Sequence, residues 1–98
     1  MPTYIRLLRY SDQAMKDFKH MRDKVAAARK AYRDAGAELK QVFVVMGQYD
    51  LVAVVEAPND ETLAKVALAR AATGDFRSTE TMRAFTEEEV AKIVAALP

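Results

Sequence analysis

The stretch VVMGQYDLVAVV, residues 44–55, decides the fold of this chain. Two valine-rich runs, which favour β-strands, flank the polar interruption GQYD at residues 47–50. Its glycine can adopt a positive φ and its aspartate can bond to local backbone, so the interruption suits a tight turn. The pattern therefore predicts a β-hairpin whose strands are residues 38–46 and 50–57.

The period of the apolar residues predicts the elements around this hairpin. Residues 3–10 and 76–85 are rich in β-branched and aromatic side chains, which is typical of strands. Residues 12–35 carry apolar side chains at spacings of alternately four and three, which indicates one long amphipathic helix. Gly36 follows at the position where a left-handed C-cap is favoured.

Capping signals predict two further helices. Asn59 or Asp60 caps a helix that runs to Ala72, and a capping box at Thr86 opens a last short helix. The order is β-α-β-β-α-β-α, whose first six elements match the ferredoxin-like βαββαβ arrangement of an α+β domain. Right-handed crossovers give a four-stranded antiparallel sheet in the order 4-1-3-2. A single domain over residues 1–98 is expected.

Both faces of the predicted sheet are apolar, whereas a sheet with one wet face shows clean alternation. The two main helices of this arrangement cover one face only. We therefore expect a homodimer or higher homo-oligomer that packs through the open sheet face. The alternative is that the last helix folds back over that face. In the strand before the turn, alternation predicts Leu39, Phe43 and Val45 on one face and Val42, Val44 and Met46 on the other.

Several motifs carry a resemblance to a known family. Gly47, Tyr49 and Asp50 form a Gly-x-Tyr-Asp turn, an ARKA segment lies in the first helix, and a Thr-Glu-Thr stretch before Ala-Phe closes the last strand. With these motifs, nearly the whole chain resembles the GYD-domain family. The resemblance implies a ferredoxin-like protomer that pairs as a dimeric α/β barrel. A similar hairpin in leucine-responsive transcription regulators implies loops that help to hold small ligands at subunit contacts.

The first helix departs from the family pattern. Family members often have a Ser-Pro and a nearby arginine midway along it, where this chain reads HMRDK at residues 20–24. Only Arg22 or Lys24 approximates that arginine, and lysine lacks its forked hydrogen-bonding geometry.

Seven residues are candidates for a ligand site. A hairpin turn does not require Tyr49, which could contribute to a pocket or subunit contact, or simply pack over the hairpin. Tyr4, Arg6 and Tyr10 share one face of the first strand, and Arg83 lies on the neighbouring last strand. These two arginines and two tyrosines could together bind a carboxylate or phosphate beneath a partner subunit. Alternatively, the charges of the last strand protect a sheet edge. The candidates are Gly47, Tyr49, Asp50, Tyr4, Arg6, Tyr10 and Arg83.

Other polar residues point to no reaction. Glu56 and Glu80 are strand carboxylates, which we expect to form salt bridges with Arg6 or Arg77. His20 is the single histidine and lacks convergent ligands at metal spacing, so no metal is predicted. No phosphate loop or nucleophile elbow occurs, and no cofactor is predicted.

Composition and net charge limit the classes of partner that this chain is expected to bind. A net charge of +1 favours neither nucleic acid nor a membrane surface. The chain has no cysteine and its first residues do not form a signal peptide, so a cytoplasmic location is expected. The leading hypothesis is a homo-oligomeric small-molecule-binding or regulatory module with a pocket at the sheet or subunit interface. The alternative is a small cofactor-independent enzyme, monooxygenase- or isomerase-like, of the dimeric α/β-barrel type.

Overall fold

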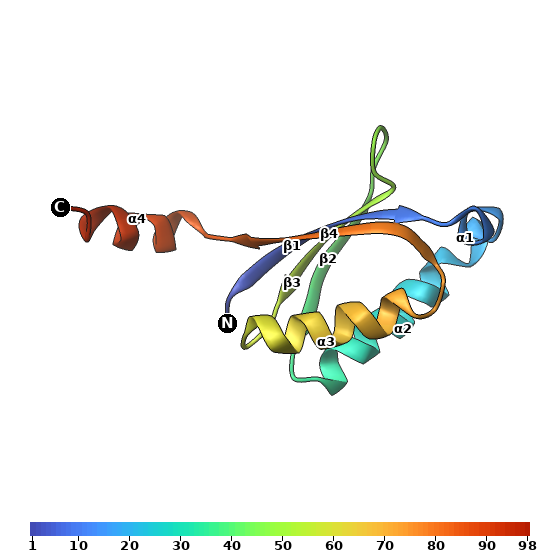
Figure 1. The fold of residues 1–98 in the computed structure, drawn as a ribbon, viewed down its shortest axis with the longest axis horizontal. Coiled ribbons are helices and arrows are strands. Elements are labelled where there is room, and N and C mark those ends of the chain that lie inside the picture. The colour runs from blue at the N-terminus through green and yellow to red at the C-terminus, as the bar shows by residue number, and fades with distance from the viewer.

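A four-stranded antiparallel sheet forms the centre of the molecule, in the order β2-β3-β1-β4 (Figure 1). The computed structural model describes residues 1–98. The order is the predicted one read from the other edge, so the α+β ferredoxin-like prediction is confirmed. The strands are β1 (Thr3–Tyr10), β2 (Glu38–Val44), β3 (Leu51–Glu56) and β4 (Phe76–Ala84).

Two helices, α2 (Met21–Asp34) and α3 (Asp60–Ala71), cover one face of this sheet (Figure 1). Asn59 caps α3 by accepting a hydrogen bond from the Thr62 backbone N–H at 2.8 Å. None of the helices is long and apolar enough to cross a membrane.

The prediction of one helix over residues 12–35 is wrong. A short α1 (Asp12–Lys16) ends at Asp17, and a 3₁₀ turn at Phe18–His20 leads into α2. Asp17 is a poor residue for a helix interior because its carboxylate competes for backbone groups. The break also lets Phe18 meet the Tyr10 ring edge-on, with centroids 6.0 Å apart. This contact joins the helical segment to β1 and is not visible in the helical period.

The core lies between the sheet and the two helices. Alternate β1 residues are buried, and the buried β3 side chains Leu51, Ala53 and Val55 lie on the same face. Leu63 and Val66 of α3 belong to the same core cluster as Ala53 and Val55. Complete burial of one such aliphatic side chain stabilises the fold by about 1.5–3 kcal/mol, so this face carries the hydrophobic stabilisation.

A bulge at Lys40 corrects the predicted faces of β2. Leu39 pairs with Val55, but Gln41 pairs with Val54, so one extra residue lies between them. Phe43 therefore pairs with Val52 and points away from the helices, on the opposite face from Leu39. Lys40 itself lies 3.7 Å from Glu38 and 3.9 Å from Glu56. Simple alternation fails because the extra residue reverses the faces of everything after it.

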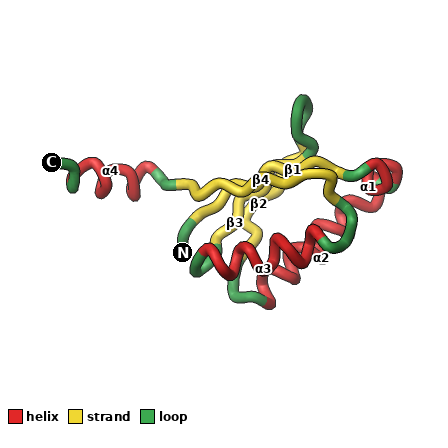
Figure 2. Tube along the Cα trace, viewed as in Figure 1, coloured by secondary structure: helices red, strands yellow, loops and turns green.

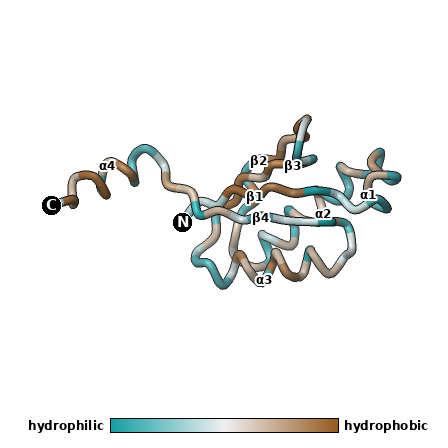
Figure 3. The backbone as a smooth tube through the Cα atoms, turned by 45° about the horizontal axis from the view of Figure 1, so that its top comes forward, coloured by the Kyte–Doolittle hydropathy of each residue, from teal (hydrophilic) through white to brown (hydrophobic).

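The other face of the sheet, which we call the open face, is left uncovered by the chain. It carries Ile5, Leu7, Phe43, Val52, Val54 and Met82. Phe43 is 50% exposed, although aromatic side chains are usually well buried. In Figure 3 the hydrophobic colouring runs along β1, the β2–β3 hairpin and also α4.

The last helix, α4 (Glu87–Ala95), does not fold back over the open face. Figures 1 and 2 show that it continues the line of β4 away from the sheet. The predicted capping box is present, with both Thr86–Glu89 hydrogen bonds at 3.1 Å. The alternative in which this helix covers its own sheet is therefore wrong.

Candidate functional site

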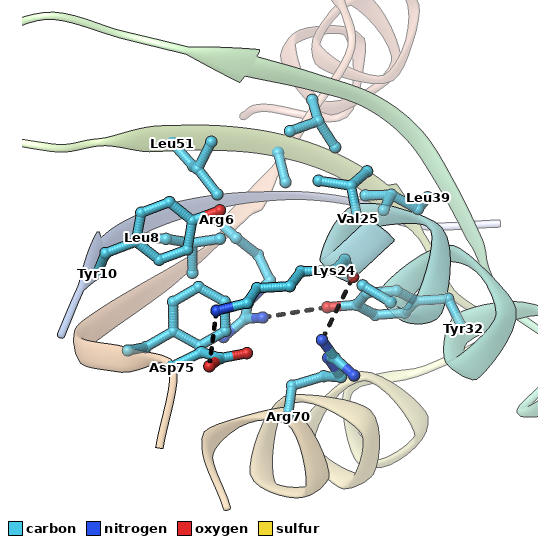
Figure 4. Close-up of a pocket in the computed structure, with 14 residues that line it drawn as sticks. Arg6, Leu8, Tyr10, Lys24, Val25, Tyr32, Leu39, Leu51, Arg70 and Asp75 are labelled. Carbon is cyan, nitrogen blue, oxygen red and sulfur yellow. Dashed lines mark hydrogen bonds and ion pairs between the residues drawn. The ribbon is translucent and has the colours of Figure 1, made fainter. Parts of the chain in front are cut away.

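A small cavity, here called the Arg6 cavity, lies between the helix-covered face of the sheet and the helices (Figure 4). Its volume is about 40 Å³, room for a few water molecules or one small chemical group. Most of its lining is apolar and comes from β1, β2, β3 and α2. The polar groups are few and are described in turn below.

Arg6 is the one charged residue that the chain buries, at 3% exposure. Its Nε donates to Thr81 Oγ1 and its Nη1 donates to the Tyr32 hydroxyl, each at 3.1 Å. The expected salt bridges with strand carboxylates are absent: Glu56 pairs with Lys40, and Glu80 accepts a hydrogen bond from Tyr49. A buried charge without a counter-ion is costly, by several kcal/mol. Arg6 is therefore the residue whose presence most needs a functional reason.

Two further cations lie beside Arg6 at the edge of the cavity. Lys24 Nζ lies 3.3 Å from Asp75 Oδ1 and 3.8 Å from Asp17 Oδ2. Arg70 Nη2 donates to the Lys24 backbone oxygen at 3.4 Å, while its buried Nε has no partner in the chain. The lining thus contains three cationic side chains and one carboxylate, Asp75. This excess of positive charge in an apolar cavity suits an anion.

Tyr10 closes one end of the cavity. Its ring stacks on Phe76, with centroids 5.7 Å apart and planes 9° from parallel. Burial raises the pKa of the Tyr10 hydroxyl, and the carboxylates of Asp75 and Asp50 raise it further. The hydroxyl therefore stays protonated at neutral pH and keeps its capacity to donate a hydrogen bond.

Tyr4 and Arg83 lie together outside this cavity, in a groove of about 410 Å³ beside α3. The Tyr4 hydroxyl donates to Asp60, and this bond, followed by burial, raises the Tyr4 pKa. The Arg83 guanidinium lies over the Tyr4 ring at 5.7 Å and pairs with Glu89 at 3.3 Å. Both residues have partners within the chain, so neither needs a ligand.

The Gly-x-Tyr-Asp turn does not reach the cavity. The loop projects to the other side of the sheet from α2 and α3 (Figure 1), and Gly47 has a φ of 110°, a region that favours glycine. The Tyr49 hydroxyl donates to Glu80 at 2.9 Å, and Arg9 lies 4.9 Å from its ring centroid. This hydrogen bond is the largest cause of a raised Tyr49 pKa. Tyr49 thus lies over the open face.

Asp50 ties the turn to β1, while its backbone oxygen accepts a hydrogen bond from the Val45 N–H within the hairpin. Its Oδ2 accepts from the Tyr10 backbone N–H at 2.8 Å, and its own N–H donates to the Leu8 oxygen at 2.9 Å. The carboxylate thereby continues the pairing of β1 beyond the point where β3 begins at Leu51.

Replacing Asp50 with alanine is expected to lower the free energy of unfolding by about 1–3 kcal/mol, because the part-buried Tyr10 N–H loses its charged acceptor. Urea denaturation followed by circular dichroism measures the change. Gln48→Ala, in the same exposed loop, is the matched control and should shift stability by less than about 0.5 kcal/mol. Equal effects of the two substitutions would contradict the structural role of Asp50.

His20 takes part in an ion pair rather than in a metal site. Its Nδ1 meets Asp17 Oδ1, and no group of three or more potential ligands lies close enough to hold a metal ion. The hydrogen bond to Asp17 raises the pKa of His20 above its ordinary 6.5. The same hydrogen bond lowers the pKa of Asp17 below its ordinary 3.8.

The His20 pair gives a pH prediction. The contribution of His20 to the free energy of unfolding is fully present below pH 6.5 and is lost as the pH rises through the raised pKa of His20. The contribution of Asp17 is present above pH 3.8 and is lost as the pH falls through the lowered pKa of Asp17. The pair therefore stabilises the fold between these limits. An NMR titration should place the His20 midpoint above 6.5, and Asp17→Asn should lower it. A midpoint that Asp17→Asn leaves unchanged would rule the pair out.

Sequence reasoning missed most of the cavity. It singled out Arg6 and Tyr10, which line the cavity, but treated Tyr32 as part of the apolar stripe and did not consider Arg70 or Asp75. One signal was present: Lys24 occupies the helix region where the chain departs from the family pattern, and it lies at the edge of the cavity. The positions of Arg70 and Asp75 depend on how α3 crosses α2.

Fold and cavity together define a ferredoxin-like α+β domain with a buried cationic cavity. The family model of the GYD domain matches residues 4–94, and the chain belongs to this family. No curated protein matches it.

Solved structures share the fold. MtbAldR superposes with a TM-score of 0.69 at 13% identity, covering 88% of this chain and 52% of that one. The transcriptional regulator NMB0573 of Neisseria meningitidis, solved as a complex with L-Met, gives 0.63 at 12% identity, covering 88% and 51%. A protein of Thermus thermophilus, TTHA0845, gives 0.57 at 28% identity, covering 88% and 95%. The chain thus spans about half the length of the first two proteins and nearly all of the third.

Proposed function

We propose that this chain is a regulatory or small-molecule-binding module whose ligand is a small organic acid. The observation that carries the proposal is Arg6, which is buried in an apolar cavity and forms no ion pair. A carboxylate in the cavity would neutralise this charge and accept its remaining N–H groups. The apolar lining would take a short hydrocarbon substituent.

The similar structures support this proposal at the level of fold. NMB0573 was solved with L-Met, a molecule that combines a carboxylate with an apolar side chain. At 12% identity this likeness carries no residue from that protein to this one. The ligand class proposed here therefore rests on the Arg6 cavity, and the neighbour adds that a domain of this fold occurs in a ligand-bound regulator.

The second part of the proposal is that the module is a homodimer or higher homo-oligomer joined through the open face. In a monomer, Phe43 and Met82 are exposed and the other four apolar side chains of this face are partly exposed. Each Å² of apolar area that a partner removes from water stabilises the complex by about 25 cal/mol. A symmetric pairing of two such faces is the simplest way to cover them. Tyr49 would then lie at the rim of the subunit contact.

A paired ligand series tests the ligand class. Acetate, propanoate and 2-methylpropanoate, whose short substituents suit the small cavity, are each compared with the corresponding amide by thermal denaturation. An acid at 100 times its Kd should stabilise the fold by about 2.7 kcal/mol, a rise of roughly 10 °C or more in Tm, whereas its neutral amide should not. Equal shifts from acid and amide, or no shift from any acid, would overturn the proposal. Conversion of an acid, detected by mass spectrometry, would instead identify the cofactor-independent enzyme.

A further inference from the structure

The C-terminal helix α4 carries an apolar stripe that its own chain does not use. Val90, Ile93 and Val94 follow the spacing i, i+3, i+4, which gathers them on one side of the helix, and Leu97 follows two residues past its end at Ala95. Their exposure ranges from 43% for Val90 to 63% for Leu97. The helix projects away from the sheet (Figure 2), so nothing in the chain covers this stripe.

An apolar groove of about 310 Å³ lies at the opposite edge of the molecule, between α2 and β2. Most of its lining residues are apolar, and one of them, Val44, is 52% exposed. Two arginines, Arg22 and Arg29, line it as well. We call it the α2–β2 groove; its apolar lining is Met21, Val25, Ala26, Val42 and Val44.

The two features cannot meet within one chain. β2 and β4 are the two outer strands of the sheet, and α4 leaves from the end of β4 in the direction away from its own domain (Figure 1). Only two residues, Phe85 and Thr86, separate β4 from α4, and they are too few to cross the sheet. An α4 helix that docks in this groove therefore belongs to another molecule.

Charge favours a second copy of this chain as that molecule. The first turn of α4 is acidic, and Glu87 lies about 60° around the helix from Val90, beside the apolar stripe. Arg22 is exposed on α2 and forms no ion pair in the chain. An acidic helix end with an aliphatic stripe matches an aliphatic groove with arginines.

We propose that α4 of one copy docks in the α2–β2 groove of a second copy, and that the exchange is reciprocal. The aliphatic stripe packs on the Val42 and Val44 side chains, and Glu87 pairs with Arg22. This inference rests on the self-association proposed above but concerns a different surface. It predicts that the contact between subunits extends from the open face to the outer edge of each sheet.

A disulfide trap tests the exchange, and the chain has no native cysteine to interfere. Val94→Cys protein is mixed with Val44→Cys protein and oxidised, and a product of twice the chain mass should appear on a non-reducing gel. Leu68→Cys, exposed on α3 outside the groove, replaces Val44→Cys in the control mixture and should give little product. Equal products in the two mixtures would overturn the exchange.

A charge exchange gives an independent readout. Arg22→Glu and Glu87→Arg should each weaken self-association by about tenfold, and the double variant should restore it. Analytical ultracentrifugation measures the dissociation constants. If the unmodified chain is a monomer, both this inference and the proposed self-association fail. If it is a dimer with neither the specific disulfide nor the charge rescue, only the docking of α4 fails.

Discussion

Replacing Arg6 with methionine is expected to abolish the binding of small carboxylates while lowering the stability of the fold by no more than about 1–3 kcal/mol. Removing one partner of a buried charge pair costs about 2–5 kcal/mol of binding free energy, so the Kd of an acid that binds should rise about 30-fold or more. The fold should tolerate the change because an apolar residue of similar size in place of a buried charge is often neutral or stabilising. Isothermal titration and urea denaturation measure the two effects separately.

The stability of this variant depends on the Tyr32 hydroxyl, which accepts a hydrogen bond from Arg6. The single substitution leaves this buried hydroxyl without its donor, at a cost of about 1–3 kcal/mol. Adding Tyr32→Phe removes the unpaired group, so the double variant should be more stable than Arg6→Met alone. The difference in stability between the single and the double variant measures the cost of the unpaired Tyr32 hydroxyl, separately from the effect of removing the buried charge.

Arg77→Met is the matched control, because Arg77 is an exposed arginine on β4 that forms no ion pair and does not line the cavity. It should change neither acid binding nor stability by more than about 0.5 kcal/mol. If Arg6→Met with Tyr32→Phe destabilises the fold by several kcal/mol, Arg6 is a structural residue. The cavity then offers no reason to propose an anionic ligand.

The sheet could be predicted because its signals are local. Alternation along β1 put Tyr4, Arg6 and Tyr10 on one face, and all three are buried there. Topology placed β1 beside β4, and the Arg6 side chain indeed reaches Thr81. Alternation along a strand gives the face of each side chain, and strand pairing gives its neighbours on that face. These contacts could therefore be predicted from the sequence.

The errors arose where contacts between two elements override the spacing of apolar residues within one element. Nothing in the segment ELKQVFV marks Lys40 as an extra residue, yet the bulge there moves Phe43 to the open face. The apolar spacing that predicted one helix over residues 12–35 continues past Asp17 without a gap. The helix nevertheless breaks there, because a contact of Phe18 with β1 stabilises the break. Propensity and spacing describe one element at a time, whereas these features depend on two.

The cavity was harder to predict than the sheet for a related reason. Lys24 and Arg70 looked like surface residues because they lie in helices rich in charge, whereas Arg6 was a site candidate that we expected to pair with a carboxylate. Whether a carboxylate lies near an arginine depends on side chains from three separate elements. The absence of an ion pair at Arg6 is therefore a property of the packed structure.

Introducing a charge at the centre of the open face, with Val54→Glu, is expected to convert the protein into a monomer of 10.9 kDa. Val54 pairs with Ile5 in the middle of the sheet and is only partly buried within the chain. Its carboxylate would be hydrated in a monomer, so the fold should persist. Between two sheets it would be buried without a partner, and the dimer dissociation constant should rise by about 10²-fold or more, which corresponds to about 3 kcal/mol.

Light scattering at micromolar concentration measures the mass, and Leu68→Glu is the control because it adds the same charge to an exposed site on α3. If Val54→Glu stays oligomeric, the open face is not the main contact. The disulfide between positions 94 and 44 then decides between two explanations. If it still forms in the Val54→Glu background, docking of α4 alone holds the copies together. If it does not, the copies meet through a surface other than the open face and the α2–β2 groove.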